Sequence, residues 1–132
     1  MLENVAERLT ELLTANTGAR PLPFDTLLAA LHGVLCSDAV WPCLQLFLEV
    51  AALAGRGDPM ARSVGERLGR GFLVWGAAQL DSSDADRAPD AVRLLVMAEG
   101  MMVLKCLGLA DVNAVALPKL WQSRDFPLRG EA

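Results

Sequence analysis

The stretch that decides the fold of this chain is DAVRLLVMAEGMMVLKCLGL, from Asp90 to Leu109. It predicts a helix with apolar side chains on almost every side. A helix that is hydrophobic all round must be covered on all sides. A chain of 132 residues has few other elements to cover it, so a second copy of the chain is the natural cover. We therefore expect a homodimer that pairs through this region.

The length and charge of the chain limit its class of function. A chain of 132 residues suits a single domain with one core, and 53% of its residues are hydrophobic. The formal net charge is −4, and the ten arginines and two lysines are scattered and mostly near acids. Nucleic-acid binders usually carry a basic face, so these residues are not expected to hold a phosphate backbone. The Ala, Leu and Arg bias is typical of a GC-rich bacterial genome.

The sequence contains no sign of a membrane span or a signal peptide. A span needs about 18 to 20 uncharged apolar residues, and the nearest segment, Ala39 to Gly55, is interrupted by Gln45 and Glu49. The opening MLENVAERL carries acids where a signal peptide needs a basic start. Three cysteines without metal spacing fit a reducing compartment. We expect a cytoplasmic protein with no membrane partner.

Apolar periodicity and helix-breaking residues divide the chain into six predicted helices. We expect them over 2–15, 26–36, 37 or 38 to 54, 59–80, 90–109 and 111–122. The expected N-caps are Asp25, Ser37 or Asp38, Asp58 and Asp111, with Pro59 as a first helical residue and Asp81–Asp86 as a polar loop. The result is an all-α domain over 1–122, with short loops between antiparallel neighbours and a loose tail over 123–132.

Three glycines, Gly65, Gly69 and Gly76, fall near one another on one face of the helix predicted over 59–80. Because glycine weakens a helix, such a cluster suggests the close approach of another backbone. Compositional drift in a Gly-rich chain is the other explanation, and both stay open here.

His32 is the only histidine, and Cys36 lies one helical turn after it. That spacing allows a thiol and a base to touch, but no third group orients the imidazole and the neighbours are mostly Leu, Ala and Val. We interpret the pair as a core or pocket-wall imidazole beside a core thiol. Cys36, Cys43 and Cys106 lack CxxC spacing and are expected to act as small hydrophobes. Since no phosphate loop, HExxH or EF-hand motif occurs, the sequence predicts no enzyme, no metal and no cofactor.

Glu99 is the most informative acid, because a helical wheel places it between Leu95 and Cys106 on one side and Val103 on the other. An acid in such surroundings lowers stability unless it is paired or hydrogen-bonded. It either faces a pocket and binds a polar group of a ligand, or it bonds a neighbouring helix end or a dimer mate.

Other side chains also allow two interpretations. Gln45 and Glu49, one turn apart, lie either on a solvated face or on a cavity wall. The aromatic and thioether side chains are expected in the core, with a subset able to line an adaptable cavity. They are Trp41, Phe47, Phe72, Trp75, Met97, Met101 and Met102.

The order of these segments resembles the C-terminal domain of TetR-family transcriptional regulators. The family typically shows a helix that ends in a GDP-like break, a long helix, an acidic loop and a helix with a small-residue-rich EG step. Here these features are Gly57-Asp58-Pro59, Pro59–Leu80, Asp81–Asp86 and Ala98-Glu99-Gly100. The opening MLENVAERLTELL is similar to the family's first helix after the DNA-binding region, and the resemblance extends to about Gln122.

The resemblance implies a small-molecule-sensing and dimerisation domain. Such a domain pairs through its last two long helices as a four-helix bundle and holds an apolar or aromatic small molecule among the earlier helices. By position, the dimer interface would include Val92, Leu95, Val96, Val103, Leu107, Val115 and Leu120. The ligand cavity would draw on Leu28, His32, Trp41, Gln45, Phe47, Glu49, Phe72, Trp75 and Glu99.

The sequence departs from the family in one respect, since the basic helix-turn-helix head of about fifty residues is absent from it. DNA contact is therefore expected only through such a head and not through these residues. Whether the sequence is a fragment or a headless relative stays open. The alternative function is a purely structural helical dimerisation module without a ligand, and a third is a small helical enzyme that uses His32 or Glu99.

Overall fold

The computed structural model describes residues 7–8, 11–12, 14–15, 18 and 20–122. Its five labelled helices are α2 (Phe24–Leu35), α3 (Trp41–Gly55), α4 (Pro59–Gln79), α5 (Asp84–Cys106) and α6 (Ala110–Gln122). The described residues of the predicted first helix, within 7–15, are helical, and the rest of that helix and the predicted tail lie outside the described residues. This part of the chain contains no strand, only an isolated parallel bridge between Leu22 and Leu80. The all-α prediction is confirmed.

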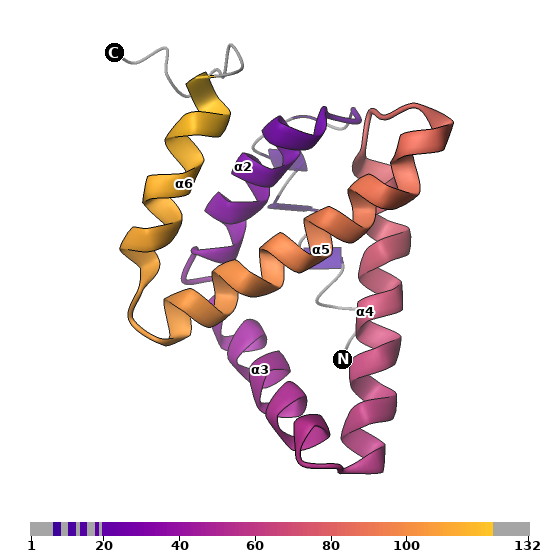
Figure 1. Ribbon diagram of the computed structural model, residues 1–132, viewed down its shortest axis with the longest axis vertical. Helices are drawn as coiled ribbons and strands as arrows, with labels where there is room; N and C mark the ends of the chain where they lie inside the picture. The colour runs from indigo at the N-terminus through magenta and orange to yellow at the C-terminus, as the bar shows by residue number, and fades with distance from the viewer. Residues whose placement is uncertain (1–6, 9–10, 13, 16–17, 19, 123–132) are drawn as a thin grey trace.

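The helices are arranged around α5. Figure 1 shows α3 and α4 diverging from a sharp turn, and α5 running diagonally from the far end of α4 to the start of α6; α5 packs on α2 along the way. Contacts join α3 to α4, and they join α5 to α2, α4 and α6; α6 also packs on α2. No labelled helix lies over the side of α5 that faces the viewer in Figure 1. None of the described helices has the length and apolar character needed to cross a membrane.

The turn between α3 and α4 forms as the sequence predicts. The Asp58 carboxylate accepts a hydrogen bond from the Ala61 N–H at 2.9 Å, and Pro59 occupies the first turn, where its missing N–H does no harm. Gly57 adopts a φ of +97°, so the Asp58 N–H reaches the Leu53 carbonyl oxygen at 3.2 Å and closes α3. The predicted cap at Asp58 is confirmed.

The predicted loop Asp81–Asp86 is wrong in its second half, because α5 begins at residue 84 instead of 90. Ser83 Oγ accepts a hydrogen bond from the Asp86 N–H at 3.2 Å and caps the helix. Asp84 and Asp86 place negative charge in the first turn, where the helix dipole favours it. Pro89 consequently lies inside α5 rather than at its start.

The predicted caps of α2 and α3 are also wrong by a few positions. Pro23 precedes the first residue of α2, so Asp25 lies in the first turn, not at the cap. Ser37 Oγ donates to the Val34 carbonyl oxygen at 2.8 Å and so closes the end of α2. Neither Ser37 nor Asp38 caps α3, because residues 36–40 form turns and the helix begins only at Trp41.

A tight turn at Gly108 separates α5 from α6. Gly108 has a φ of +81°, the left-handed conformation that commonly ends a helix. α6 begins one residue before Asp111, which therefore lies in its first turn and not at the cap. Pro118 lies within α6 and does not end it.

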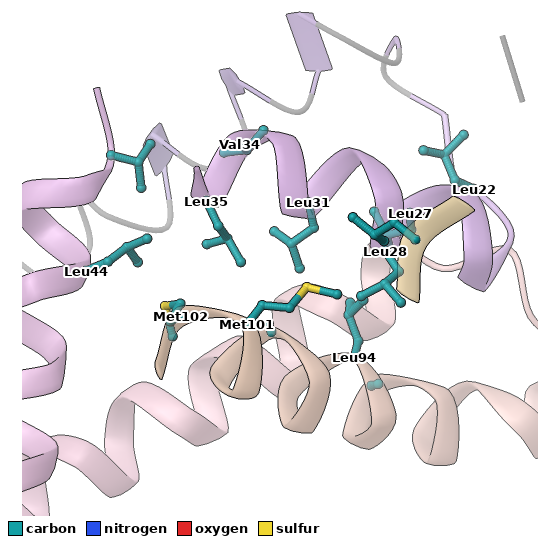
Figure 2. Close-up of a cluster of buried hydrophobic side chains, with 14 of the residues drawn as sticks. Leu22, Leu27, Leu28, Leu31, Val34, Leu35, Leu44, Leu94, Met101 and Met102 are labelled. Carbon is teal, nitrogen blue, oxygen red and sulfur yellow. The ribbon is translucent and has the colours of Figure 1, made fainter. Parts of the chain in front are cut away.

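The core lies mainly between α2 and α5. Figure 2 shows Leu28, Leu31 and Leu35 of α2 directed toward Leu94, Met101 and Met102 of α5. Leu22, Leu44, Leu80 and Leu117 extend the same buried cluster to the neighbouring elements. Met101 and Met102 are therefore core residues, which leaves Met97 as the exposed member of the three methionines of α5.

The three glycines of α4 have different surroundings. A Cβ atom added at Gly76 would lie 3.4 Å from Leu94 Cδ2 of α5, and one at Gly65 would lie 4.0 Å from Val50 Cγ1 of α3. A Cβ added at Gly69 would meet no atom within 4 Å. Side chains rather than another backbone approach Gly76 and Gly65, while Gly69 borders open space.

Candidate functional site

The predicted ligand-binding residues differ in exposure. Leu28 is fully buried in the core. Gln45 and Glu49 are exposed on α3, so the solvated-face interpretation holds for this pair and neither joins the other site residues. The remaining predicted residues are half-buried, namely His32, Trp41, Phe47, Phe72, Trp75 and Glu99.

Half-buried aromatic rings gather at the edge of the core. Phe72 and Trp75 of α4 form a tilted pair with ring centroids 5.4 Å apart. Both rings pack against the buried cluster, as do Trp41 and Phe47 of α3. Phe72 lies on the same side of α4 as Gly69, three residues earlier, where the structure leaves open space. Apolar and aromatic side chains of this kind line the sites of apolar small molecules.

A polar cluster forms where the end of α2, the start of α3 and the end of α5 meet. His32 Nε2 lies 3.5 Å from Cys36 Sγ, one turn further along the chain. Lys105 Nζ of α5 donates to the Cys36 carbonyl oxygen at 3.2 Å, and it lies 4.2 Å from the centroid of the Trp41 ring. We call His32, Cys36, Trp41 and Lys105 the Cys36 cluster.

The surroundings of His32 favour its neutral form. Burial lowers the pKa of the imidazole below its ordinary value of 6.5, and the positive charge of Lys105 lowers it further. A neutral imidazole carries one nitrogen that accepts a hydrogen bond, so Nε2 can accept the Cys36 S–H. The cluster therefore brings together a thiol, a neutral imidazole and an ammonium group. The imidazole lies against the thiol, and the ammonium group donates to the backbone of the same cysteine.

Glu99 is half-buried on α5, and burial raises the pKa of its carboxyl group above the ordinary value of 4.5. It lies beside the exposed residues Val96 and Val103, which precede and follow it by three and four positions. The acid is thus at the edge of the exposed apolar surface of α5, and the described part of the chain forms no ion pair with it.

Exposed apolar side chains occur on both α5 and α6, two helices that contact each other. Val92, Val96 and Val103 share one side of α5 by their spacing, and Leu107 follows directly after the helix ends; Val112 and Val115 share one side of α6. All six are exposed, with 63% of Val96, 67% of Leu107 and 75% of Val115 accessible. We call these six residues the α5–α6 face. Five of them are predicted interface residues.

The two remaining predicted interface residues differ from these five. Leu95 is half-buried, because the side of α5 on which it lies turns toward the core beside Ala91 and Met102. The side chain of Leu120 lies outside the described part of the structure. Val112, which the sequence analysis left out, follows from the same apolar pattern in α6.

The sequence analysis also missed two residues that fix the geometry of the site. The signal that could have identified Lys105 is its position, because it is one of only two lysines in the chain and interrupts an apolar run. Asn113 is 5% exposed, and its Nδ2 donates to the Met101 carbonyl oxygen of α5 at 3.1 Å. This bond sets the register of α6 against α5.

Within the residues that the structure describes, no three side chains of His, Cys, Asp or Glu lie together as a metal site. No family model, curated protein or solved structure matches the chain. The resemblance to TetR-family regulators therefore stays a prediction that rests on the sequence pattern.

Proposed function

We propose that this chain is the small-molecule-sensing and dimerisation domain of a TetR-like transcriptional regulator, and that it is not an enzyme. The observation that carries the proposal is the α5–α6 face, a set of exposed valines and a leucine on two adjacent helices. In this proposal the described helices sense and pair, and DNA reading belongs to a helix-turn-helix head.

The α5–α6 face favours a twofold pair. Soluble monomers rarely expose a large contiguous apolar patch unless it serves an interaction. A twofold interface brings the same patch of each copy together, so an apolar face on two helices pairs with itself as a four-helix bundle. Glu99 at the edge of the face would then satisfy its carboxyl group at the rim, where interfaces are polar.

The half-buried aromatic rings support the sensing half of the proposal. Phe72 and Trp75 on α4 form a tilted ring pair, and these rings and that of Phe47 on α3 are half-buried against the core, so part of their apolar surface stays accessible. A flat apolar or aromatic molecule would replace water against these rings without requiring a charged partner. Lys105, over the Trp41 ring, marks the polar end of the same region of α3.

A second candidate is a structural dimerisation module with no ligand. The burial of Leu28, Met101 and Met102 favours it, because side chains that would otherwise line a cavity fill the core. This module and the sensing domain share the α5–α6 face and differ only in the response to small molecules.

Thiol cross-linking tests the pairing, and the chain supplies its own control. Cys106 is exposed at the last position of α5, three residues after Val103, whereas Cys43 is exposed on α3. We expect copper–phenanthroline oxidation to trap a disulfide dimer that Cys106→Ser abolishes and Cys43→Ser retains. A wild-type chain that sediments as a monomer at micromolar concentration, or a cross-link that depends on Cys43 instead, would refute the pairing.

Thermal unfolding with a library of aromatic and aliphatic compounds tests the sensing. A ligand that binds only the folded state at 100 times its Kd stabilises that state by about 2.7 kcal/mol. We expect at least one compound to raise the Tm of the wild type and to lose this effect in Phe72→Ala. If no compound raises the Tm while the pair forms normally, the structural module is the correct function.

A further inference from the structure

The Cys36 cluster has a property that neither pairing nor reversible sensing requires. It joins a thiol, an imidazole and an ammonium from two helices that are distant in the chain, with Lys105 69 positions after Cys36. Cys36 is half-buried and not sealed in the core. Such a combination is the usual surrounding of a reactive thiol.

The contact between the two side chains is suited to proton transfer, since Cys36 Sγ lies 3.5 Å from His32 Nε2. His32 is neutral near pH 7, because burial and Lys105 lower its pKa. In the tautomer whose Nε2 carries no proton, the Cys36 S–H donates to Nε2, and the imidazole can take the proton when sulfur attacks. Because His32 lies in the last turn of α2 and Cys36 is the residue that ends this helix, folding of α2 holds the pair together.

Lys105 corrects an unfavourable feature of the position. Cys36 follows the last residue of α2, and the negative end of a helix dipole opposes a thiolate there. The Lys105 ammonium bonds the Cys36 carbonyl oxygen at 3.2 Å and so places positive charge at that helix end. Its position over the Trp41 ring, 4.2 Å from the centroid, keeps the side chain in place.

The other two cysteines lack this arrangement. Cys43 and Cys106 are exposed, and within the described residues neither has a histidine or a lysine bonded to it. Exposure alone would make them the more reactive thiols, so a faster reaction at half-buried Cys36 can come only from its neighbours.

We propose that Cys36 is a covalent modification site for small electrophiles of the α,β-unsaturated carbonyl class, with His32 as the base and Lys105 as the positioning cation. The sulfur forms a bond to the β-carbon, and the C=C π pair moves onto the α-carbon and carbonyl oxygen. The thiol proton passes to His32 Nε2 and returns to the α-carbon, so no other reactant is needed. The Lys105 ammonium stabilises the charge that develops on the oxygen, and the flat face of Trp41 suits a planar molecule.

The test is the rate of reaction of each cysteine with N-ethylmaleimide, an electrophile of this class, followed by peptide mass spectrometry on the wild-type chain. Cys43 is the reference thiol, because it is exposed and lies outside the α5–α6 face. We expect Cys36 to react at least tenfold faster than Cys43 in the folded chain, and the two to react at similar rates in guanidinium, since a positioned base contributes about 100-fold or more. Equal or slower reaction of Cys36 in the folded chain would overturn the proposal.

Two variants separate reactivity from access. His32→Gln and Lys105→Met should each slow Cys36 by about tenfold or more and leave Cys43 unchanged. If either variant unfolds, circular dichroism detects it, and the comparison of folded with unfolded wild type still decides the question. An unchanged Cys36 rate in folded His32→Gln would rule out the imidazole as base. These rates do not depend on pairing, so their failure leaves the proposed function standing, and the reverse also holds.

Discussion

Replacing Val96 tests whether the α5–α6 face is covered in solution. Val96 is 63% exposed in the single chain, and Val96→Ala removes two carbon atoms from the face. Full burial of two such groups stabilises by about 1.6 kcal/mol, so covering the exposed part is worth about 1 kcal/mol in each copy. Because a twofold pair buries the residue twice, we expect Val96→Ala to weaken pairing by about 2 kcal/mol, or roughly 30-fold in Kd.

Val96→Glu should have a much larger effect on the same equilibrium. It would bury one carboxylate in each copy next to Glu99, and each unpaired buried charge costs several kcal/mol. The pair should then dissociate at concentrations where the wild type is fully dimeric. In the single chain the position faces water, so the free energy of unfolding of the monomer should change by less than about 0.5 kcal/mol.

Sedimentation velocity over a concentration series measures both effects, and Val74→Glu is the matched control. Val74 is 74% exposed on α4, outside the α5–α6 face, and should tolerate glutamate without loss of pairing. The reasoning is refuted if Val96→Glu sediments as the wild type does, or if Val74→Glu dissociates the pair to the same extent.

Three further predictions concern stability. Leu94→Ala empties a fully buried position in α5 and should lower the free energy of unfolding by roughly 2 to 5 kcal/mol in urea titrations, whereas a loss below about 1 kcal/mol would contradict its place in the core. Because the pKa of His32 lies below 6.5 in the folded chain, acidification through pH 6.5 protonates the unfolded chain first and lowers stability. His32→Gln should lack this loss. The difference in free energy of unfolding between wild type and His32→Gln should therefore be smaller at about pH 5.5 than at about pH 7.5. Asn113→Ala should cost about 1 to 2 kcal/mol, and Asn113→Asp more at neutral pH because it places a charge against the Met101 carbonyl oxygen; equal stability of Asn113→Asp and wild type would contradict that bond.

The sequence predicts helix boundaries well where the signal is local and strong. Asp58 and Pro59 combine a cap with a residue suited to the first turn, and α4 begins where they indicate. Pro89 misled the prediction for α5, because proline usually marks a helix start. Here the carbonyl oxygen that its missing N–H leaves free belongs to Ala85, an exposed residue at the helix start, and the cap at Ser83 determines where α5 begins.

The site is predictable only in the parts that come from one helix. The spacing of His32 and Cys36 places them together at the end of α2, and the structure agrees. Lys105 reaches them from α5 through a contact that depends on how two helices cross, which one sequence does not specify. For the same reason the apolar pattern of α5 predicts its exposed face but not the rotation that turns Leu95 partly inward.

The bond from Asn113 to the backbone of α5 bears on how the chain can evolve. A carbonyl oxygen is present whatever residue occupies position 101, so the attachment of α6 survives most substitutions along its neighbour. The exposed residues of α5 and α6 can therefore change during evolution, as different partners are selected, while the same bond continues to hold the two helices together.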